Sequence, residues 1–389
     1  MTERVAIVIG GGPAGLMAAE VLATAGVRVV LLEQMASVGR KLLIAGRGGL
    51  NLTHSEDLDT FLSRYGTARP RLAAALDAFG PDDLRAWCAS LGEEPFVGSS
   101  GRVFPAGFRA TPLLRAWKRR LSDLGVEVRV RTRWAGFDDT PDADAVVLAL
   151  GGASWPRTGS DGAWVESVAR RGVAVAPLRP ANCGFIAAWT EEFRTRFAGT
   201  PIKNVALSFE GAVARGDIVV ADDGIEAGPV YALSAALRDA LAHDGAATVL
   251  CDLTPYVSAD ALASRLARRR AGDSAASWLR RAGLAPVAVG LLREATHNEL
   301  PHDARAVAEL AKRVPIRVTA PYPLARAIST AGGITLSEVD DGFMLRRRPG
   351  VFVAGEMLDW EAPTGGYLLQ ATFSTAVAAA RGALAWMAR

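Results

Sequence analysis

A glycine pattern near the N-terminus constrains the fold of this chain more than any other feature. The uncharged, β-branched run Val5–Ile9 predicts a buried strand. Gly10, Gly12 and Gly15 follow at once with the spacing G-x-G-x-x-G, and residues 16–25 predict a helix. In this order the first glycine permits a tight turn, the second lets a pyrophosphate approach the backbone, and the third lets helix and strand pack closely. The sequence therefore predicts a Rossmann-type nucleotide-binding unit.

A second apolar segment ends in an acidic residue. Residues 27–32 predict a strand, and Glu33 lies eighteen residues after Gly15. A carboxylate at this place accepts hydrogen bonds from both hydroxyls of an adenosine ribose, and it disfavours a 2′-phosphate. Pro13 and Ala14 open the helix, whose free N–H groups and positive dipole end face the phosphates. The expected ligand is FAD or NAD.

The segment 39–54 holds many glycines together with three cations. We expect it to form an irregular loop that wraps the far side of the pyrophosphate. Arg40 and Lys41 would supply positive charge, and the glycines at 46–49 would let the backbone lie against a flat ring. The alternative is a solvated basic surface loop, because basic side chains are usually exposed.

A segment near the C-terminus, which we expect to return to the nucleotide-binding unit, distinguishes FAD from NAD. Glu356 follows a predicted strand and Gly355, where a carboxylate can accept a hydrogen bond from a ribityl hydroxyl. Gly365 and Gly366 open the last helix, and its first N–H groups would meet the flavin pyrimidine edge, where reduction places negative charge. FAD is long enough to need such a return, so FAD is the expected cofactor. An ordinary glycine loop before a packed terminal helix is the alternative.

Composition excludes several classes of protein. The net charge of +3 is too small to indicate a nucleic-acid or anionic-membrane partner, and no run of about twenty residues is apolar enough to span a membrane. Three distant cysteines predict neither a disulfide framework nor a zinc site, and four histidines show no metal-ligand spacing. We expect a cytoplasmic protein without a metal.

The order of predicted strands and helices along the chain indicates three parts. Strands alternate with helices at both ends, which indicates an α/β fold with a parallel sheet. Short alternating runs from about residue 177 indicate an antiparallel sheet or small barrel, followed by an Arg-rich helical stretch. The predicted domains are a split Rossmann-type FAD-binding domain, 1–176 and 322–389; an inserted barrel-like β domain, 177–254 and 314–321; and a small helical lid, 255–313.

Five ordered segments carry a resemblance to a known family: 10–33, 39–51, 101–105, 149–162 and 332–366. Together they resemble the BaiN-like flavoproteins, NAD(P)/FAD-dependent oxidoreductases also called aminoacetone-oxidase-like. The resemblance implies non-covalent FAD and the same three-part architecture. It places the backbone of Trp134 at the adenine edge, and Ala149 and Gly151 along the adenosine side. The full set of expected cofactor-binding residues is Gly10, Gly12, Pro13, Ala14, Gly15, Glu33, Gln34, Arg40, Lys41, Gly46, Asn51, Trp134, Ala149, Gly151, Gly355, Glu356, Gly365, Gly366, Tyr367 and Leu368.

One loop departs from the family pattern. The family reads Gly-Gly-Gly-Arg-Cys-Asn, whereas residues 46–51 read Gly-Arg-Gly-Gly-Leu-Asn. The arginine has moved two places to Arg47, and Leu50 replaces the cysteine, which excludes a thiol beside the flavin. Asn51 remains aligned. The departure indicates a divergent subfamily with another substrate.

No acid or base is assigned for the chemistry, and four residues near the expected ring are weak candidates. They are Asn51, His54, Tyr367 and Arg102. Packing is favoured over proton donation for Tyr367. For Arg102, an internal ion pair is favoured over a substrate carboxylate.

The expected activity is that of an FAD-dependent oxidoreductase in which hydride passes through flavin N5 to a small unsaturated or oxidised substrate. NADH or NADPH would bind transiently, because no second dinucleotide pattern is present. An oxygen-using oxidase is one alternative. An RNA-associated flavoprotein and a non-catalytic scaffold are others, and the weak net charge counts against RNA. The oligomeric state is left open.

Overall fold

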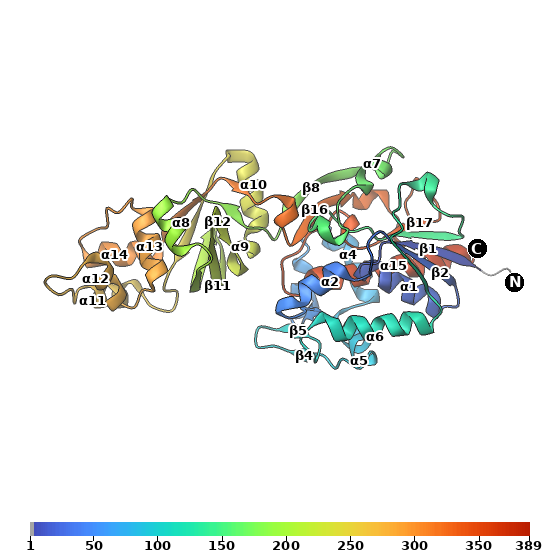
Figure 1. The fold of residues 1–389 in the computed structure, drawn as a ribbon, viewed down its shortest axis with the longest axis horizontal. Coiled ribbons are helices and arrows are strands. Elements are labelled where there is room, and N and C mark those ends of the chain that lie inside the picture. The colour runs from blue at the N-terminus through green and yellow to red at the C-terminus, as the bar shows by residue number, and fades with distance from the viewer. Residues whose placement is uncertain (1–3) are drawn as a thin grey trace. The chain divides into compact units, whose positions relative to one another are not determined.

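The structure is a computed structural model that describes residues 4–389 (Figure 1). Its contacts divide the chain into two compact units. The discontinuous unit runs to Arg179 and resumes at Ile328–Arg389, and the inserted unit is Pro180–Ala327. The three-part division expected from the sequence stays a prediction.

A five-stranded parallel sheet organises the discontinuous unit, in the order β17-β7-β1-β2-β6. Its strands are β1 (Val5–Ile9), β2 (Arg28–Glu33), β6 (Glu127–Val130), β7 (Ala145–Leu148) and β17 (Val351–Val353). All but the exposed edge strand β6 are almost wholly buried, which explains why their sequences are apolar apart from Arg28 and Glu33 at the two ends of β2. The predicted parallel sheet is confirmed. The carboxyl ends of its strands meet at one edge, where ligands bind in such folds.

Two helices from opposite ends of the chain pack together in this unit: α1 (Pro13–Thr24) and α15 (Tyr367–Met387). Pro13 lies in the first turn of α1. A proline is tolerated there because N–H groups of the first turn have no hydrogen-bond partner within the helix.

The other elements of the unit are α2 (Arg40–Ala45), β3 (Thr53–His54), α3 (Leu58–Ser63), α4 (Arg69–Ala78), α5 (Pro81–Ser90), β4 (Phe96–Val97), β5 (Arg102–Phe104), α6 (Ala110–Asp123), α7 (Trp164–Ala169), β8 (Val175–Ala181) and β16 (Ser329–Ile334).

Two local expectations were wrong. The segment 39–54 is not an irregular loop, because α2, a short 3-10 turn and β3 lie within it. Residues 40–45 are good helix formers, and Leu42 is buried. Gly39 precedes the helix as its N-cap and has a left-handed backbone conformation, with φ 73°. The sequence of residues 101–105 also predicts a turn into an edge strand, whereas β5 lies between β3 and β4 in a three-stranded sheet.

The inserted unit holds a seven-stranded sheet in the order β14-β13-β10-β11-β12-β9-β15, and every pairing is antiparallel. Its strands are β9 (Phe185–Ile186), β10 (Pro201–Phe209), β11 (Ala212–Ala221), β12 (Gly224–Glu226), β13 (Ala247–Asp252), β14 (Val314–Val318) and β15 (Ala320–Pro321). The end strands β14 and β15 are separated only by Thr319, so the sheet must curl until its two ends meet. The predicted antiparallel insertion is confirmed.

The helices of the inserted unit share a second hydrophobic core with its sheet. They are α8 (Glu191–Phe197), α9 (Gly228–Ala232), α10 (Ser234–Asp244), α11 (Ala259–Leu266), α12 (Ala275–Arg281), α13 (Pro286–Ala295) and α14 (Ala304–Lys312). Within residues 4–389, no helix combines the length and hydrophobicity that crossing a membrane requires.

Candidate functional site

The three glycines after β1 have different surroundings. A Cβ at Gly10 would lie 2.3 Å from the Ala149 carbonyl oxygen, and one at Gly15 would lie 1.8 Å from the Gly10 carbonyl oxygen. A Cβ at Gly12 would meet no atom of residues 4–389 within 4 Å. Gly10 and Gly15 are therefore required by the fold itself, whereas the side of Gly12 is open to a ligand.

Glu33 lies at the end of β2 and is 8% exposed. One of its carboxylate oxygens accepts a hydrogen bond from the Gly11 N–H and the other from the Met35 N–H, each at 2.7 Å. Each oxygen has a further lone pair, so the carboxylate can still accept ribose hydroxyls. The Thr132 N–H donates to the Glu33 carbonyl at 2.9 Å, which brings the segment leading to Trp134 beside the end of β2. Gln34 donates its side-chain amide to the Gly159 carbonyl.

Lys41 and Glu356, 315 residues apart, form an ion pair at 2.6 Å. The ammonium group of Lys41 also donates to the Ser154 hydroxyl at 2.7 Å. The second carboxylate oxygen of Glu356 accepts from the Thr330 N–H at 2.9 Å. Lys41 and Glu356 were expected to contact different parts of the cofactor. In the structure they form an ion pair with each other.

The C-terminal return contacts the first helix at Gly355. A Cβ at this position would lie 2.9 Å from the Cβ of Ala14, and the backbone has a φ of 74°. Gly151 also has a positive φ, 73°, and faces the Ser160 hydroxyl. The glycine turn after β1 and the return after β17 therefore meet within one unit.

The last helix begins against the strand β3. A Cβ at Gly366 would lie 2.4 Å from the carbonyl carbon and oxygen of Thr53. Tyr367, the first residue of α15, is 5% exposed, and its carbonyl accepts a hydrogen bond from the Tyr65 hydroxyl at 2.8 Å. Gly46 is equally constrained, because a Cβ there would lie 2.6 Å from that of Ala110.

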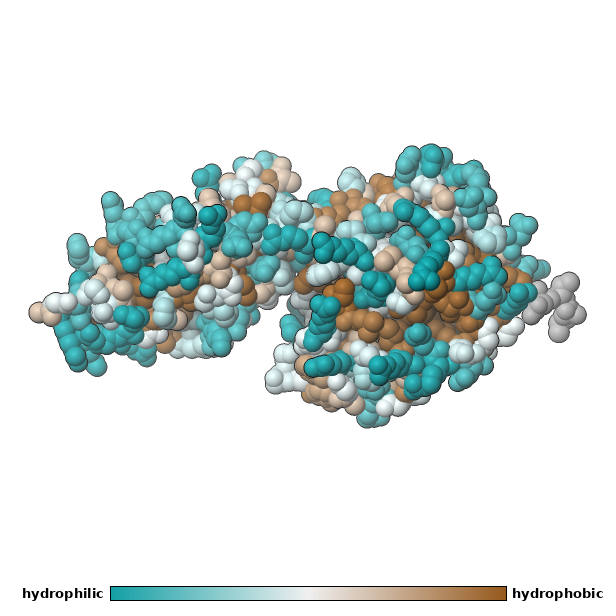
Figure 2. Space-filling view, in the orientation of Figure 1, coloured by the Kyte–Doolittle hydropathy of each residue, from teal (hydrophilic) through white to brown (hydrophobic). Residues whose placement is uncertain are grey.

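Four buried polar atoms beside these segments have no hydrogen-bond partner among the described residues. They are Arg40 Nε, Asn51 Oδ1, Thr53 Oγ1 and Ser160 Oγ. Such atoms are rare in folded proteins and indicate a missing polar partner. Figure 2 shows hydrophobic side chains at the surface over α1 and α2, bordered by hydrophilic ones. Open space at Gly12, unpartnered polar atoms and an apolar surface together fit a long, part-polar, part-aromatic cofactor such as FAD.

The sequence predicted Arg40 and Asn51 but missed Thr53 and Ser160. Both missed residues lie close in the chain to predicted ones, Thr53 after Asn51 and Ser160 after Gly151. A small hydroxyl residue gives no pattern by itself, so only the fold shows that these atoms are buried without a partner.

His54 packs beside Tyr367 with ring centroids 5.4 Å apart. Its Nδ1 accepts from the Glu56 N–H at 3.2 Å, so we assign the ring proton to Nε2, which donates to the Ser100 carbonyl at 3.0 Å. Both ring nitrogens are therefore engaged with the backbone.

Tyr367 also faces a charged pair. Burial and a hydrogen bond with Glu56 raise the pKa of the Tyr367 phenol. Burial of Glu56 opposes its ionisation, but the hydrogen bonds from Arg64 and Tyr367 outweigh it and lower the pKa of Glu56. Tyr367 is therefore a neutral phenol, and Glu56 a carboxylate, near neutral pH.

Arg102 is exposed, and its Nε lies 3.7 Å from the Cβ position of Gly365. No carboxylate among residues 4–389 forms an ion pair with it. The internal partner that the sequence favoured for Arg102 is thus not present in the described chain.

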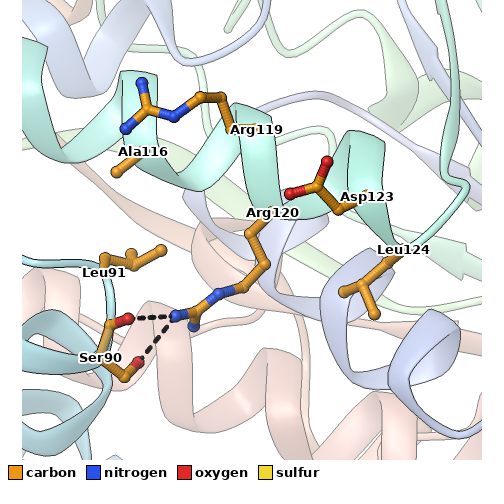
Figure 3. Close-up of a pocket in the computed structure, with 7 residues that line it drawn as sticks. All are labelled: Ser90, Leu91, Ala116, Arg119, Arg120, Asp123 and Leu124. Atoms are coloured by element: carbon orange, nitrogen blue, oxygen red, sulfur yellow. Dashed lines mark hydrogen bonds between the residues drawn. The ribbon is translucent and has the colours of Figure 1, made fainter.

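A surface pocket of about 340 Å³ is lined by none of the residues expected to bind the cofactor (Figure 3). It is lined by Ser90 and Leu91 together with residues of α6, among them Arg119, Arg120 and Asp123. Arg120 donates to the Ser90 carbonyl and hydroxyl and pairs with the buried Glu20 at 3.1 Å. Its guanidinium is therefore already engaged. Across residues 4–389, no cluster of three or more potential metal ligands is present.

Comparisons with known proteins identify relatives of this chain. The model of the HI0933-like protein Rossmann domain matches residues 4–382. A 3-dehydro-bile acid delta(4,6)-reductase of Clostridium scindens is 27% identical over 97% of this chain and 98% of its own. A ribosomal RNA dihydrouridine synthase of Haemophilus influenzae is 24% identical over 52% of this chain and 54% of its own.

The fold is also similar to that of a solved structure. A 3-ketosteroid delta1-dehydrogenase from Sterolibacterium denitrificans has a TM-score of 0.52 and 11% sequence identity, with 98% of this chain and all of that chain covered. At this identity the likeness concerns the fold alone.

Proposed function

Since the chain belongs to the HI0933-like family and is an FAD-dependent oxidoreductase, we propose that it catalyses the NAD(P)H-dependent reduction of a carbon–carbon double bond conjugated to a carbonyl group. The observation that carries the cofactor assignment is the contact between the turn after β1 and the return after β17, at Ala14 and Gly355. This contact joins the two halves that a long dinucleotide needs. Flavin, when bound, supplies hydride transfer through its N5.

The residues that would hold FAD follow from the surroundings described above. The open side of Gly12 would receive the pyrophosphate, and the free lone pairs of Glu33 would accept the ribose hydroxyls. Asn51 Oδ1 and Thr53 Oγ1 would gain partners at the ring end. The first N–H groups of α15 would stabilise negative charge there, since a helix N-terminus carries a partial positive charge.

The relatives suggest the type of bond that is reduced. The names of both matched enzymes describe the saturation of a carbon–carbon double bond next to a carbonyl, one in a 3-dehydro-bile acid and one in uridine. Such a reduction consumes one NAD(P)H and one proton, and the two former double-bond carbons each gain a hydrogen. Tyr367 is the candidate proton donor, because it is the first residue of α15, beside the segment assigned to the ring, and its phenol is neutral.

The proposal is tested by asking what reoxidises the reduced holoprotein. The protein is reduced with dithionite without oxygen and is then mixed with cyclohex-2-enone, uridine or oxygen. We expect saturable reoxidation by the enone, slowed by about 100-fold in Tyr367→Phe, the size of a general-acid contribution. Reoxidation by oxygen alone would contradict the proposal and favour an oxidase.

A second candidate is action on a base within RNA, which the similarity to the ribosomal RNA dihydrouridine synthase supports. The Arg-rich helices α11–α14 would then contact phosphates. The small net charge counts against it. An RNA affinity that falls steeply with salt, together with reoxidation by the RNA and not by the enone, would favour this candidate.

A further inference from the structure

One face of the small sheet β3-β5-β4 gathers side chains that the cofactor site does not use. In antiparallel pairing, residues directly opposite each other point to the same face. His54 lies opposite Arg102, and Phe96 lies opposite Phe104. Arg102 and Phe104 alternate with Val103, which is fully buried on the other side. We call His54, Phe96, Arg102, Phe104 and the adjoining Phe108 the Phe/Arg face.

Its three phenylalanines form one continuous aromatic patch. The centroids of Phe96 and Phe104 are 5.7 Å apart, those of Phe104 and Phe108 4.7 Å, and those of Phe96 and Phe108 6.4 Å, all near-parallel. Phe96 and Phe108 are each 43% exposed. Phe108 has a φ of 59°, a conformation that costs free energy for a bulky residue. Apolar surface of this kind in water indicates a binding site.

The Phe/Arg face contacts both glycine segments assigned to the flavin ring. A ring carbon of Phe108 lies 2.6 Å, and one of Phe104 3.3 Å, from the Cβ position of Gly49. Arg102 Nε lies 3.7 Å from that of Gly365. The Leu50 N–H also donates to the Phe108 carbonyl at 2.9 Å. The face therefore adjoins the place where the hydride donor would lie.

Arginines without an ion pair adjoin this face, together with two carboxylates that already have partners. Glu56 pairs with Arg64 at 2.7 Å, and Glu93 accepts a hydrogen bond from the Gly107 N–H at 3.2 Å. Arg47 and Arg109 are exposed in the segments next to Gly49 and Phe108. Like Arg102, neither forms an ion pair within residues 4–389. An unpaired guanidinium beside an apolar patch is complementary to a carboxylate on an apolar body.

We propose that the Phe/Arg face binds the substrate, a flat, unsaturated ring molecule with an acidic group. The rings of Phe96, Phe104 and Phe108 pack against its apolar body, and Arg102 forms a charged hydrogen bond with its anionic group. The inference rests on the proposed function. The three rings stack on one another, which suits a single ring system better than the successive bases of a nucleic-acid strand.

The test uses a matched pair of probes, 2-naphthoate and its neutral analogue 2-naphthamide. Each is titrated into the oxidised holoprotein, and binding is followed by the change in the flavin absorption spectrum. We expect the acid to bind about tenfold more tightly than the amide, the range of a hydrogen bond to a charged group. Arg102→Gln should abolish this preference and leave the affinity for the amide unchanged.

Arg119→Gln is the matched control. Arg119 is another exposed arginine without an ion pair in the described chain, and it lies ten residues beyond Arg109 on α6, about 15 Å along the helix. It should leave both affinities unchanged. Phe108→Leu and Phe96→Leu should each weaken both probes by about threefold or more. An unchanged thermal midpoint shows that a variant is folded.

Three results would overturn the inference. Equal affinities for acid and amide would exclude Arg102 as an anion site. Phenylalanine variants that change the oligomeric state and not probe affinity would assign the face to an interface between copies of the chain. Salt-dependent binding of an oligouridylate, lost in the same variants, would assign it to nucleic acid. Failure of the proposed function is distinct, since it appears as absent flavin or as no reoxidation by an enone.

Discussion

At the scale of single residues, the glycines after β1 fall into two kinds: those that the packing of the chain requires, and one whose surroundings leave room for a ligand. Gly10 and Gly15 face backbone carbonyls so closely that no side chain fits. Gly12 has ordinary extended dihedral angles, φ −80° and ψ −178°, and open space beside it. An alanine at position 12 would therefore fit the folded chain and would conflict only with a ligand that lies against this turn.

This contrast gives a prediction with its own control. Gly12→Ala should cost about 0.5 kcal/mol of stability, as for an altered helix N-cap, but should weaken FAD binding by more than about tenfold because the methyl group takes the space of the pyrophosphate. Gly15→Ala should destabilise the apoprotein by about 3 kcal/mol, because a Cβ there overlaps the Gly10 carbonyl. Urea unfolding of the apoproteins and FAD titration measure the two effects. Equal FAD affinity in Gly12→Ala and wild type would contradict the assignment of the pyrophosphate.

Single-residue roles were only partly predictable from the sequence. Gly10, Gly12, Gly15 and Glu33 follow a local pattern, and their roles in cofactor binding stay predictions. The pairing of Lys41 with Glu356 could not be predicted, because it joins segments that only the tertiary fold brings together. The unpartnered hydroxyls of Thr53 and Ser160 were missed for the same reason.

At the scale of elements, periodicity predicted the long strands and helices well and the short ones poorly. The strands β1 and β2 and the helix α1 begin and end within a few residues of their expected bounds. The helix α2 was not predicted, because four of the sixteen residues in 39–54 are glycines, and such a content is typical of a loop. β5 was placed at an edge because its short, Pro-terminated run gave no sign of its two partners.

The start of α15 depends on one buried hydrogen bond from another helical region. Tyr65, 2% exposed, donates its hydroxyl to the Tyr367 carbonyl. Tyr65→Phe should therefore cost about 1 kcal/mol of unfolding free energy, the typical value for a lost hydrogen bond. Urea unfolding of the apoprotein measures it, and Tyr256→Phe is the control, because Tyr256 is 78% exposed. Equal losses in the two variants would show that the buried bond is not stabilising.

At the scale of the whole molecule, the family resemblance is confirmed by the match over residues 4–382. The split α/β unit and the antiparallel insertion were also predicted correctly. The dinucleotide pattern lies near the N-terminus and the flavin-type segment near the C-terminus, so the two ends of the chain must belong to one unit that the insertion interrupts. The substrate could not be predicted, since the side chains that we propose for its recognition, such as Phe108 and Arg102, follow no common motif.

Alkaline pH should test the packing of the whole molecule through its tyrosines. Burial raises the pKa of four of the five, Tyr65, Tyr231, Tyr322 and Tyr367, above the ordinary value of 10.0. In the unfolded chain these phenols ionise first, so their contribution to stability is complete below about pH 10 and is lost as the pH rises further. Absorbance of tyrosinate in native protein should therefore lag behind that in denaturant. Coincident titration curves would show that the four phenols are not buried.

The absorption spectrum of the purified protein, recorded without oxygen before and after adding NADH and then NADPH, shows whether this chain is an NAD(P)H-dependent flavoenzyme. We expect a flavin spectrum that one of the two donors bleaches, and a Gly12→Ala protein that is folded but retains much less flavin. A flavin that neither donor bleaches would contradict the NAD(P)H-dependent reductase. A colourless protein that does not take up added FAD would contradict the central claim that this chain is a flavoenzyme.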